Sequence, residues 1–177
     1  MRQLVKVLVI AATLAGAASG ASAGVIYANA GLGAASTTLT FDEIVLGNGT
    51  SLTNQYAGFG VTFAGAYYNP QTSAFPPATS GNQIGNFSPT VSPWSIFFSS
   101  DVGEAAFGIA TNPNTTFVEA LLNGVVVGSA SAATDYDGTD FFQVTGLTFD
   151  EIRLTTTGDQ LPESVFAQSG IQPKALM

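Results

Sequence analysis

Residues 135–154 read DYDGTDFFQVTGLTFDEIRL, a stretch that joins three clustered carboxylates to an aromatic run and ends in an octapeptide that the chain uses twice. The two copies are LTFDEIVL at 39–46 and LTFDEIRL at 147–154, which agree at seven of eight positions. In each copy the apolar positions change phase at the Asp-Glu pair, and because a strand has a period of two residues, each copy must bend or bulge there. The repeat predicts two bent strands that lie in one region of the fold, although over a hundred residues separate them in sequence.

Short alternating runs extend in both directions from this stretch. They predict strands near 37–45, 56–63, 95–99, 104–110, 117–122, 125–131, 141–154 and 165–171. We expect 95–99 and 104–110 to form one hairpin. Asn123-Gly124 is expected to close another, because this dipeptide favours the positive φ angles of a type I′ turn. The predicted fold class is therefore all-β, as an antiparallel, jelly-roll-like β-sandwich.

The phase of these runs also predicts which side chains are buried. The expected core consists of Leu39, Phe41, Val61, Phe63, Trp94, Ile96, Phe98, Phe107, Ile109, Leu122, Val125, Ile152 and Leu154. Glu119 is the one carboxylate that we place inside a strand, on the solvent-facing phase, and the other carboxylates fall in turns or bends. A glycosidase or lyase based on carboxylates is therefore kept only as a second alternative.

The first 23 residues have the pattern of a secretory signal peptide. Arg2 and Lys6 precede the apolar run 7–14, and small residues lead to Ala21-Ser22-Ala23, which predicts cleavage after Ala23. We expect a signal-peptide helix at 1–23, a loose leader at 24–36, a single β-sandwich domain at 37–172 and a tail at 173–177. The protein is expected to be secreted, extracellular or on the cell surface, with no membrane span after signal cleavage.

Composition disfavours several classes of function. Without the signal peptide, two basic residues face twelve carboxylates, so the net charge is −10. Nucleic acids and anionic membranes are poor partners for such a chain, because both require a basic surface. The chain has no Cys for disulfides, and the absence of His removes the commonest general base, the usual zinc ligand and any Ser-His triad.

Two acidic motifs are candidates for a cation site. Asp135, Asp137 and Asp140 occur at close spacing around a glycine, and calcium prefers several oxygen ligands on a loop that can close around it. The alternative is a solvated turn without an ion. A second candidate site uses Asp42 and Glu43, which we place beside the last strand.

A long uncharged segment is the candidate for binding a neutral ligand. Residues 44–100 contain no Asp, Glu, Lys or Arg, and the loop at 64–94 is rich in aromatic and amide side chains. Aromatic rings suit the C–H faces of sugars, and amides suit their hydroxyl groups. The candidate ligand-binding residues are Tyr67, Tyr68, Asn69, Asn82 and Gln83, with burial in the core as the alternative. The predicted function is an exported, non-catalytic surface or extracellular-matrix module that binds polysaccharide weakly; the alternative is a purely structural matrix protein, with or without calcium.

Four segments together resemble a known family. TFDEI at 40–44, TNQYAGFGVTF at 53–63, WSIFFSSDVGEAAFGIATNPNTTFVEALLNGVVVGS at 94–129 and FFQVTGLTFDEIRL at 141–154 are similar, in this order, to secreted bacterial β-sandwich proteins of the PEP-CTERM type, which are associated with surfaces and exopolysaccharide. The resemblance implies a β-sandwich and a cation site between an N-terminal Asp and a C-terminal Phe-Ala-x-Asp-Asn strand. Here residues 166–170 read FAQSG, with Ser-Gly in place of Asp-Asn, and the family's sorting tail is absent after Lys174.

Overall fold

The computed structural model describes residues 23–32, 38–70, 82–86, 93–111, 113–135, 137, 139–157 and 164–166. This part of the chain is all-β with antiparallel pairing, and it contains one 3-10 turn, η1 (Ala57–Phe59), but no α-helix. The predicted signal-peptide helix, apart from Ala23, and the predicted tail at 173–177 lie outside the described residues.

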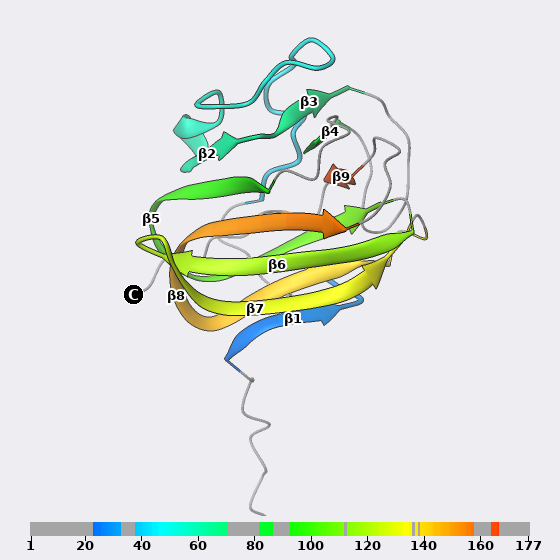
Figure 1. Ribbon diagram of the computed structural model, residues 1–177. Coiled ribbons are helices and arrows are strands. Elements are labelled where there is room, and N and C mark those ends of the chain that lie inside the picture. Colours follow the sequence, from blue (N-terminus) through cyan, green and yellow to red (C-terminus); the bar gives the residue numbers. More distant parts are fainter. Residues whose placement is uncertain are drawn as a thin grey trace, which may run out of the picture.

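The strands form one nine-stranded sheet system (Figure 1). They are β1 (Gly24–Ala28), β2 (Val61–Ala64), β3 (Tyr67–Asn69), β4 (Gln83–Asn86), β5 (Trp94–Ala110), β6 (Asn114–Leu122), β7 (Val125–Thr134), β8 (Phe141–Thr157) and β9 (Ser164–Phe166). The order of neighbours is β3-β4-β9-β5-β8-β6-β7, while β1 pairs with β8 and β2 pairs with β5. The two long strands β5 and β8 therefore connect all the others.

The pairing of β5 with β8 bends along its length. Phe107 pairs with Phe142 at one end and Ile96 with Ile152 at the other, with register shifts on both sides of Val102. Because Phe149 and Ile152 are both buried, the side chains of β8 change phase at Asp150-Glu151, as the octapeptide predicts. Bends of this kind let one strand serve two packed layers.

β1 and β6 pair with successive parts of β8, on the two sides of this bend. The bend brings β1 against β7 without β-pairing between them: a Cβ added to Gly128 of β7 would lie 3.4 Å from Cγ2 of Val25. The enclosed core is one cluster, with aromatic edge contacts such as Phe98 on Phe149 at 5.6 Å between ring centroids. Most of the predicted core residues are buried, Trp94 among them.

Leu122 and Val125 are the exceptions in the predicted core. Leu122 is half-buried and Val125 is 66% exposed. Ala120 pairs with Gly128 while Leu121 pairs with Val126, so β7 carries one extra residue and the phase of the hairpin shifts. Leu121 is buried instead. The hairpin itself is confirmed, with φ angles of 52° at Asn123 and 77° at Gly124.

The predicted hairpin of 95–99 and 104–110 is wrong, because both runs belong to the single strand β5. Asp101-Val102-Gly103 does not form a turn. Val102 is buried and pairs with Phe149, so the irregular segment is absorbed as a bulge opposite β8.

The first octapeptide is not a strand, in contrast to the prediction for 37–45. Phe41 has a φ of 61°, and its carbonyl oxygen accepts hydrogen bonds from the hydroxyl groups of Tyr56 (3.4 Å) and Tyr68 (3.3 Å). The Phe41 ring packs edge-on against Tyr56 and Phe63, which anchors this irregular segment in the core. Phe63 in turn pairs with Ile96 of β5, so the two octapeptides contribute to one core through different conformations.

The leader predicted at 24–36 is also corrected, since β1 occupies its first residues. Val25 is buried and pairs with Val144, and Tyr27 pairs with Phe142. The small, glycine-rich composition of 24–36 hid this strand, because its larger side chains Val25, Ile26 and Tyr27 form one short run without alternation. At the other end, β9 (Ser164–Phe166) begins one residue before the predicted 165–171 strand and overlaps it at residues 165 and 166, and residues 167–171 lie outside the described part.

Candidate functional site

Three of the five predicted ligand-binding residues are buried. Tyr68, Asn69 and Gln83 lie in the paired strands β3 and β4, with Asn69 opposite Gln83. Burial raises the pKa of Tyr68 above its ordinary value, because the ionised phenolate would be desolvated. The alternative given for this region, burial in the core, therefore describes where these three side chains lie, and ligand binding by them stays a prediction. The uncharged segment contributes the short strands β3 and β4 here.

Tyr67 and Asn82 are half-buried and lie at the margin of this region. The Asn82 backbone N–H and side-chain amide both donate to Oδ1 of Asp42, at 3.2 and 2.7 Å. The amide therefore fastens the 38–50 segment to the start of β4. Residues 71–81 and 87–92 of the predicted binding loop lie outside the described residues.

The second acidic candidate, Asp42 and Glu43, is used for local hydrogen bonds. The backbone N–H and the hydroxyl group of Thr40 donate to Oε1 of Glu43, at 2.7 and 2.8 Å. Asp42 accepts from Asn82, as described above. Within the described residues these two carboxylates belong to no cluster of three acidic groups.

Asp135, Asp137 and Asp140 do converge. One oxygen from each lies within 4.8 Å of the others, close enough for a single hard cation to contact all three. Two of these carboxylates also accept hydrogen bonds within the turn: Oδ2 of Asp140 from Asp135 N at 2.7 Å, and Oδ1 of Asp135 from Asp137 N at 2.7 Å. The loop geometry is compatible with both hypotheses, a calcium site and a turn closed by its own backbone.

Thr139 stabilises the ionised carboxylate of Asp137. Its hydroxyl group and its backbone N–H donate to Oδ1 of Asp137, at 2.7 and 2.8 Å. These bonds hold the pKa of Asp137 below its ordinary value, because they stabilise the carboxylate form.

Asp140 ties this loop to the N-terminal strand. It is 3% exposed, and its Oδ1 accepts a hydrogen bond from the hydroxyl group of Tyr27 in β1. This hydrogen bond, together with burial and the nearby carboxylates, raises the pKa of Tyr27 to about 12. Asp140 thus has a structural role that the sequence did not reveal, because its partner lies more than a hundred residues away.

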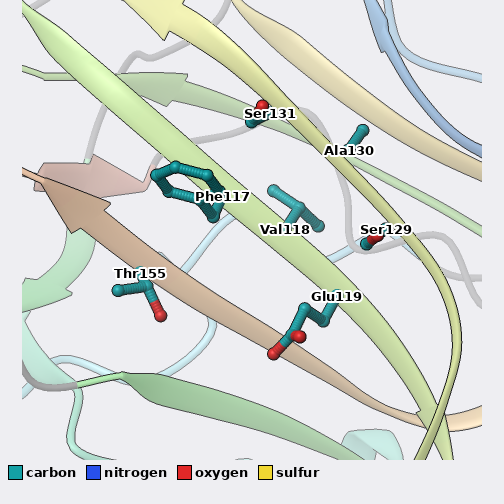
Figure 2. A pocket seen from close by; sticks show the side chains of 7 residues that line it. All are labelled: Phe117, Val118, Glu119, Ser129, Ala130, Ser131 and Thr155. Atoms are coloured by element: carbon teal, nitrogen blue, oxygen red, sulfur yellow. The ribbon is translucent and has the colours of Figure 1, made fainter.

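A second surface feature lies on the outward face of β6, β7 and β8. The pairing register of β6 with its two neighbours places Phe117 between Ser131 of β7 and Thr155 of β8. It likewise places Glu119 between Ser129 of β7 and Arg153 of β8. Directly opposite residues in antiparallel strands share a face, so these side chains point outward together. They border an open depression of about 610 Å³, shown in Figure 2, which is lined by Phe117, Val118, Glu119, Ser129, Ala130, Ser131 and Thr155.

Phe117 is 41% exposed, with hydroxyl groups on both sides of its ring. The phase of the 117–122 run contained the signal for this site, because it places Phe117 on the same polar face as Glu119. An aromatic ring on the solvent-facing phase is the feature that sequence reasoning overlooked.

An ion-pair network lies beside the depression. Nη1 of Arg153 lies 3.6 Å from Oε2 of Glu119, and Nη2 lies 3.2 Å from Oε1 of Glu151. The Ser95 hydroxyl group donates to the same Glu151 oxygen at 2.7 Å. Glu151 is buried within β8, so the expectation that Glu119 alone sits in a strand is wrong. Two carboxylates offset the single positive charge of Arg153 on this face.

No protein-family model, curated protein or solved structure matches this chain. In the part of the chain that the structure describes, no helix is long and apolar enough to cross a membrane. Functional inference therefore depends on the geometry of the depression and of the acidic loop.

Proposed function

We propose that this protein is an exported, non-catalytic surface or matrix module that folds as a jelly-roll-like β-sandwich and binds neutral carbohydrate weakly. The proposed binding surface is the outward face of β6, β7 and β8, in place of the 64–94 loop. The supporting observation is the exposed ring of Phe117 at a depression bordered by Ser129, Ser131 and Thr155. The resemblance to PEP-CTERM-type proteins, noted from the sequence, agrees with a location at the bacterial surface.

The chemistry of the depression favours sugars over other small ligands. The ring of Phe117 offers an apolar platform for the C–H face of a pyranose, and the neighbouring hydroxyl groups offer hydrogen bonds to its edge. Its volume of about 610 Å³ falls within the range of small-molecule sites, but a single ring on an open surface leaves much of a ligand in water. The protein is therefore expected to bind such sugars weakly.

Charge favours a neutral glycan. Arg153 is the one basic residue in the described part of the chain, and Glu119 and Glu151 both contact it. The face therefore offers no unopposed positive charge to a uronic acid or a sulfated sugar. The net charge of −10 after signal removal also disfavours polyanions.

The matching experiment is a glycan array followed by titration with neutral oligosaccharides, using Phe117→Ala and Phe59→Ala as a matched pair. Phe59 is 39% exposed but lies in η1, away from this face. We expect Phe117→Ala to abolish binding and Phe59→Ala to preserve it. Absence of glycan binding by the wild type would favour the purely structural alternative. Release of reducing sugar from a polysaccharide by the pure protein would instead establish the carboxylate-based glycosidase or lyase alternative.

A further inference from the structure

A second exposed aromatic ring lies on the same outward face as Phe117. Phe97 of β5 is 37% exposed, whereas its neighbours in the strand, Ile96 and Phe98, are buried. Side chains alternate between the two faces of a strand, so the ring of Phe97 points away from the core. Phe97 is not among the residues that line the depression, and the proposed function leaves it without a role.

The pairing register shows that both rings belong to one face of one sheet. β8 pairs with β5 on one side and with β6 on the other, as Figure 1 shows. Across these three strands, the buried residues Ile96, Ile152 and Ala120 lie directly opposite one another on the core face. Phe97 is one residue from Ile96, and Phe117 is three residues from Ala120. Both rings therefore lie on the opposite, outward face of the sheet.

The two rings are too far apart for one sugar to contact both. Phe97 pairs with Glu151 of β8, and Phe117 pairs with Thr155 of the same strand. The offset along β8 corresponds to about 13 Å, and the two strand spacings from β5 to β6 correspond to about 10 Å. The diagonal between the two positions is therefore about 16 Å. A ligand that contacts both rings must be an extended chain of several sugars.

A polar network occupies the middle of this diagonal. Arg153 pairs with Ser95 on one side and with Glu119 on the other, so its row of residues lies between the two rings. The Nε and Nη2 groups of Arg153 contact Oε1 of Glu151, at 3.3 and 3.2 Å. Nη1 of Arg153 and Oε1 of Glu119 form no hydrogen bond with other described residues. N–H donors and a carboxylate oxygen are thus available to the hydroxyl groups of a ligand.

This arrangement favours a polysaccharide over a protein partner. The centre of a protein–protein interface is apolar and depleted of charged residues. Here the exposed rings of Phe97 and Phe117 are separated, and the partly exposed ion pair of Arg153 with Glu119 lies between them. A linear glycan presents both C–H faces and hydroxyl edges along its length, so it can place each kind of group where this face offers a partner.

We propose that this face binds one linear neutral polysaccharide along the diagonal, with sugars on Phe117 and Phe97 and hydroxyl groups on Glu119 and Arg153 between them. The inference rests on the proposed function, because it takes Phe117 as the first platform. It adds Phe97 as a second platform and restricts the ligand to extended chains. A disaccharide reaches one ring, whereas a chain that spans about 16 Å reaches both. The second contact is made within a complex that has already formed, so affinity rises with chain length until both rings are covered.

The test is an NMR titration of the purified protein with linear neutral oligosaccharides. A panel of neutral glucans, mannans, xylans and galactans first selects a polymer that binds, and its disaccharide and hexasaccharide are then compared. The wild type should bind the hexasaccharide more tightly than the disaccharide. Phe97→Ala should weaken binding of the hexasaccharide roughly tenfold, the effect of removing about 50–60 Å² of apolar contact, and leave binding of the disaccharide unchanged.

Two further variants serve as controls. Phe97→Tyr keeps an aromatic ring and should retain tight binding of the hexasaccharide. Ile26→Ala should bind like the wild type, because Ile26 is 38% exposed but lies in β1, which pairs with the other part of β8.

Unchanged hexasaccharide binding by Phe97→Ala, or equal affinity of the wild type for both lengths, would overturn the second platform. An equal loss for both lengths would overturn it too, because Phe97 would then act on the structure of the first site. Binding of no polymer in the panel, or full binding by Phe117→Ala, would overturn the proposed function itself.

Discussion

The contact between Tyr27 and Asp140 offers a sharp test of how the N-terminal strand is held. Tyr27→Phe removes the hydroxyl donor and leaves a carboxylate that is 3% exposed with one hydrogen-bond donor fewer. A hydrogen bond to a charged group contributes about 1.5–3 kcal/mol, and loss of the donor also costs the desolvation of its partner. The backbone N–H of Asp135 still bonds the other oxygen of Asp140, which limits the loss.

The pKa of Tyr27 gives a second measure of the same contact. A rise of the pKa from 10.0 to about 12 corresponds to a contribution of about 2.7 kcal/mol to the free energy of unfolding. Because Tyr27 is 45% exposed, solvent screening reduces this contribution to about 1 kcal/mol. The discounted value applies because Tyr27 is only partly buried. The expected cost of Tyr27→Phe at neutral pH is therefore about 1–2 kcal/mol. At about 2–4 °C per kcal/mol, Tm should fall by roughly 2–8 °C.

The pH dependence has a definite sign. The folded-state pKa of Tyr27 lies above its unfolded value, so its contribution is complete below pH 10 and is lost as the pH rises toward about 12. Tyr56 and Tyr68 also have raised pKa values, which makes the difference between wild type and Tyr27→Phe the informative quantity. That difference should shrink between pH 10 and 12.

Thermal melts followed by circular dichroism from pH 7 to 12 make this measurement. Ile26→Ala is the control, because it removes apolar surface from β1 without touching Asp140. Its stability relative to the wild type should not depend on pH in this window. Identical melts for wild type and Tyr27→Phe at pH 7, or a difference that persists at pH 12, would refute the assigned role of the hydrogen bond.

Three further predictions concern the acidic loop, the core and the hairpin. If Asp135, Asp137 and Asp140 hold calcium, a hundredfold excess of calcium over its Kd should stabilise the fold by about 2.7 kcal/mol relative to EDTA. Asp137→Ala should abolish this stabilisation. Equal changes in Tm with magnesium or with matched sodium chloride would identify a turn without a specific ion. Phe149→Ala should cost about 3–5 kcal/mol in urea unfolding, against less than about 1.5 kcal/mol for the surface variant Phe97→Ala, and similar values for both would contradict the assigned core. Gly124→Ala, at a φ of 77°, should cost about 1–2 kcal/mol, and a neutral effect would argue against the observed turn.

Features that depend on local sequence were predicted well. The Asn123-Gly124 turn, the alternation of Trp94 with Ile96 and Phe98, and the change of phase at Asp150-Glu151 all follow from neighbouring residues. These features were sufficient to predict an antiparallel all-β fold.

Features that depend on distant partners were missed. The octapeptide at 39–46 is irregular because the hydroxyl groups of Tyr56 and Tyr68 bond the Phe41 carbonyl, whereas its near-identical copy at 147–154 is held in β8 by the strands on either side. The role of β1 and the burial of the predicted ligand residues likewise come from pairing across the chain. The acidic loop keeps its predicted residues together because they are close in sequence.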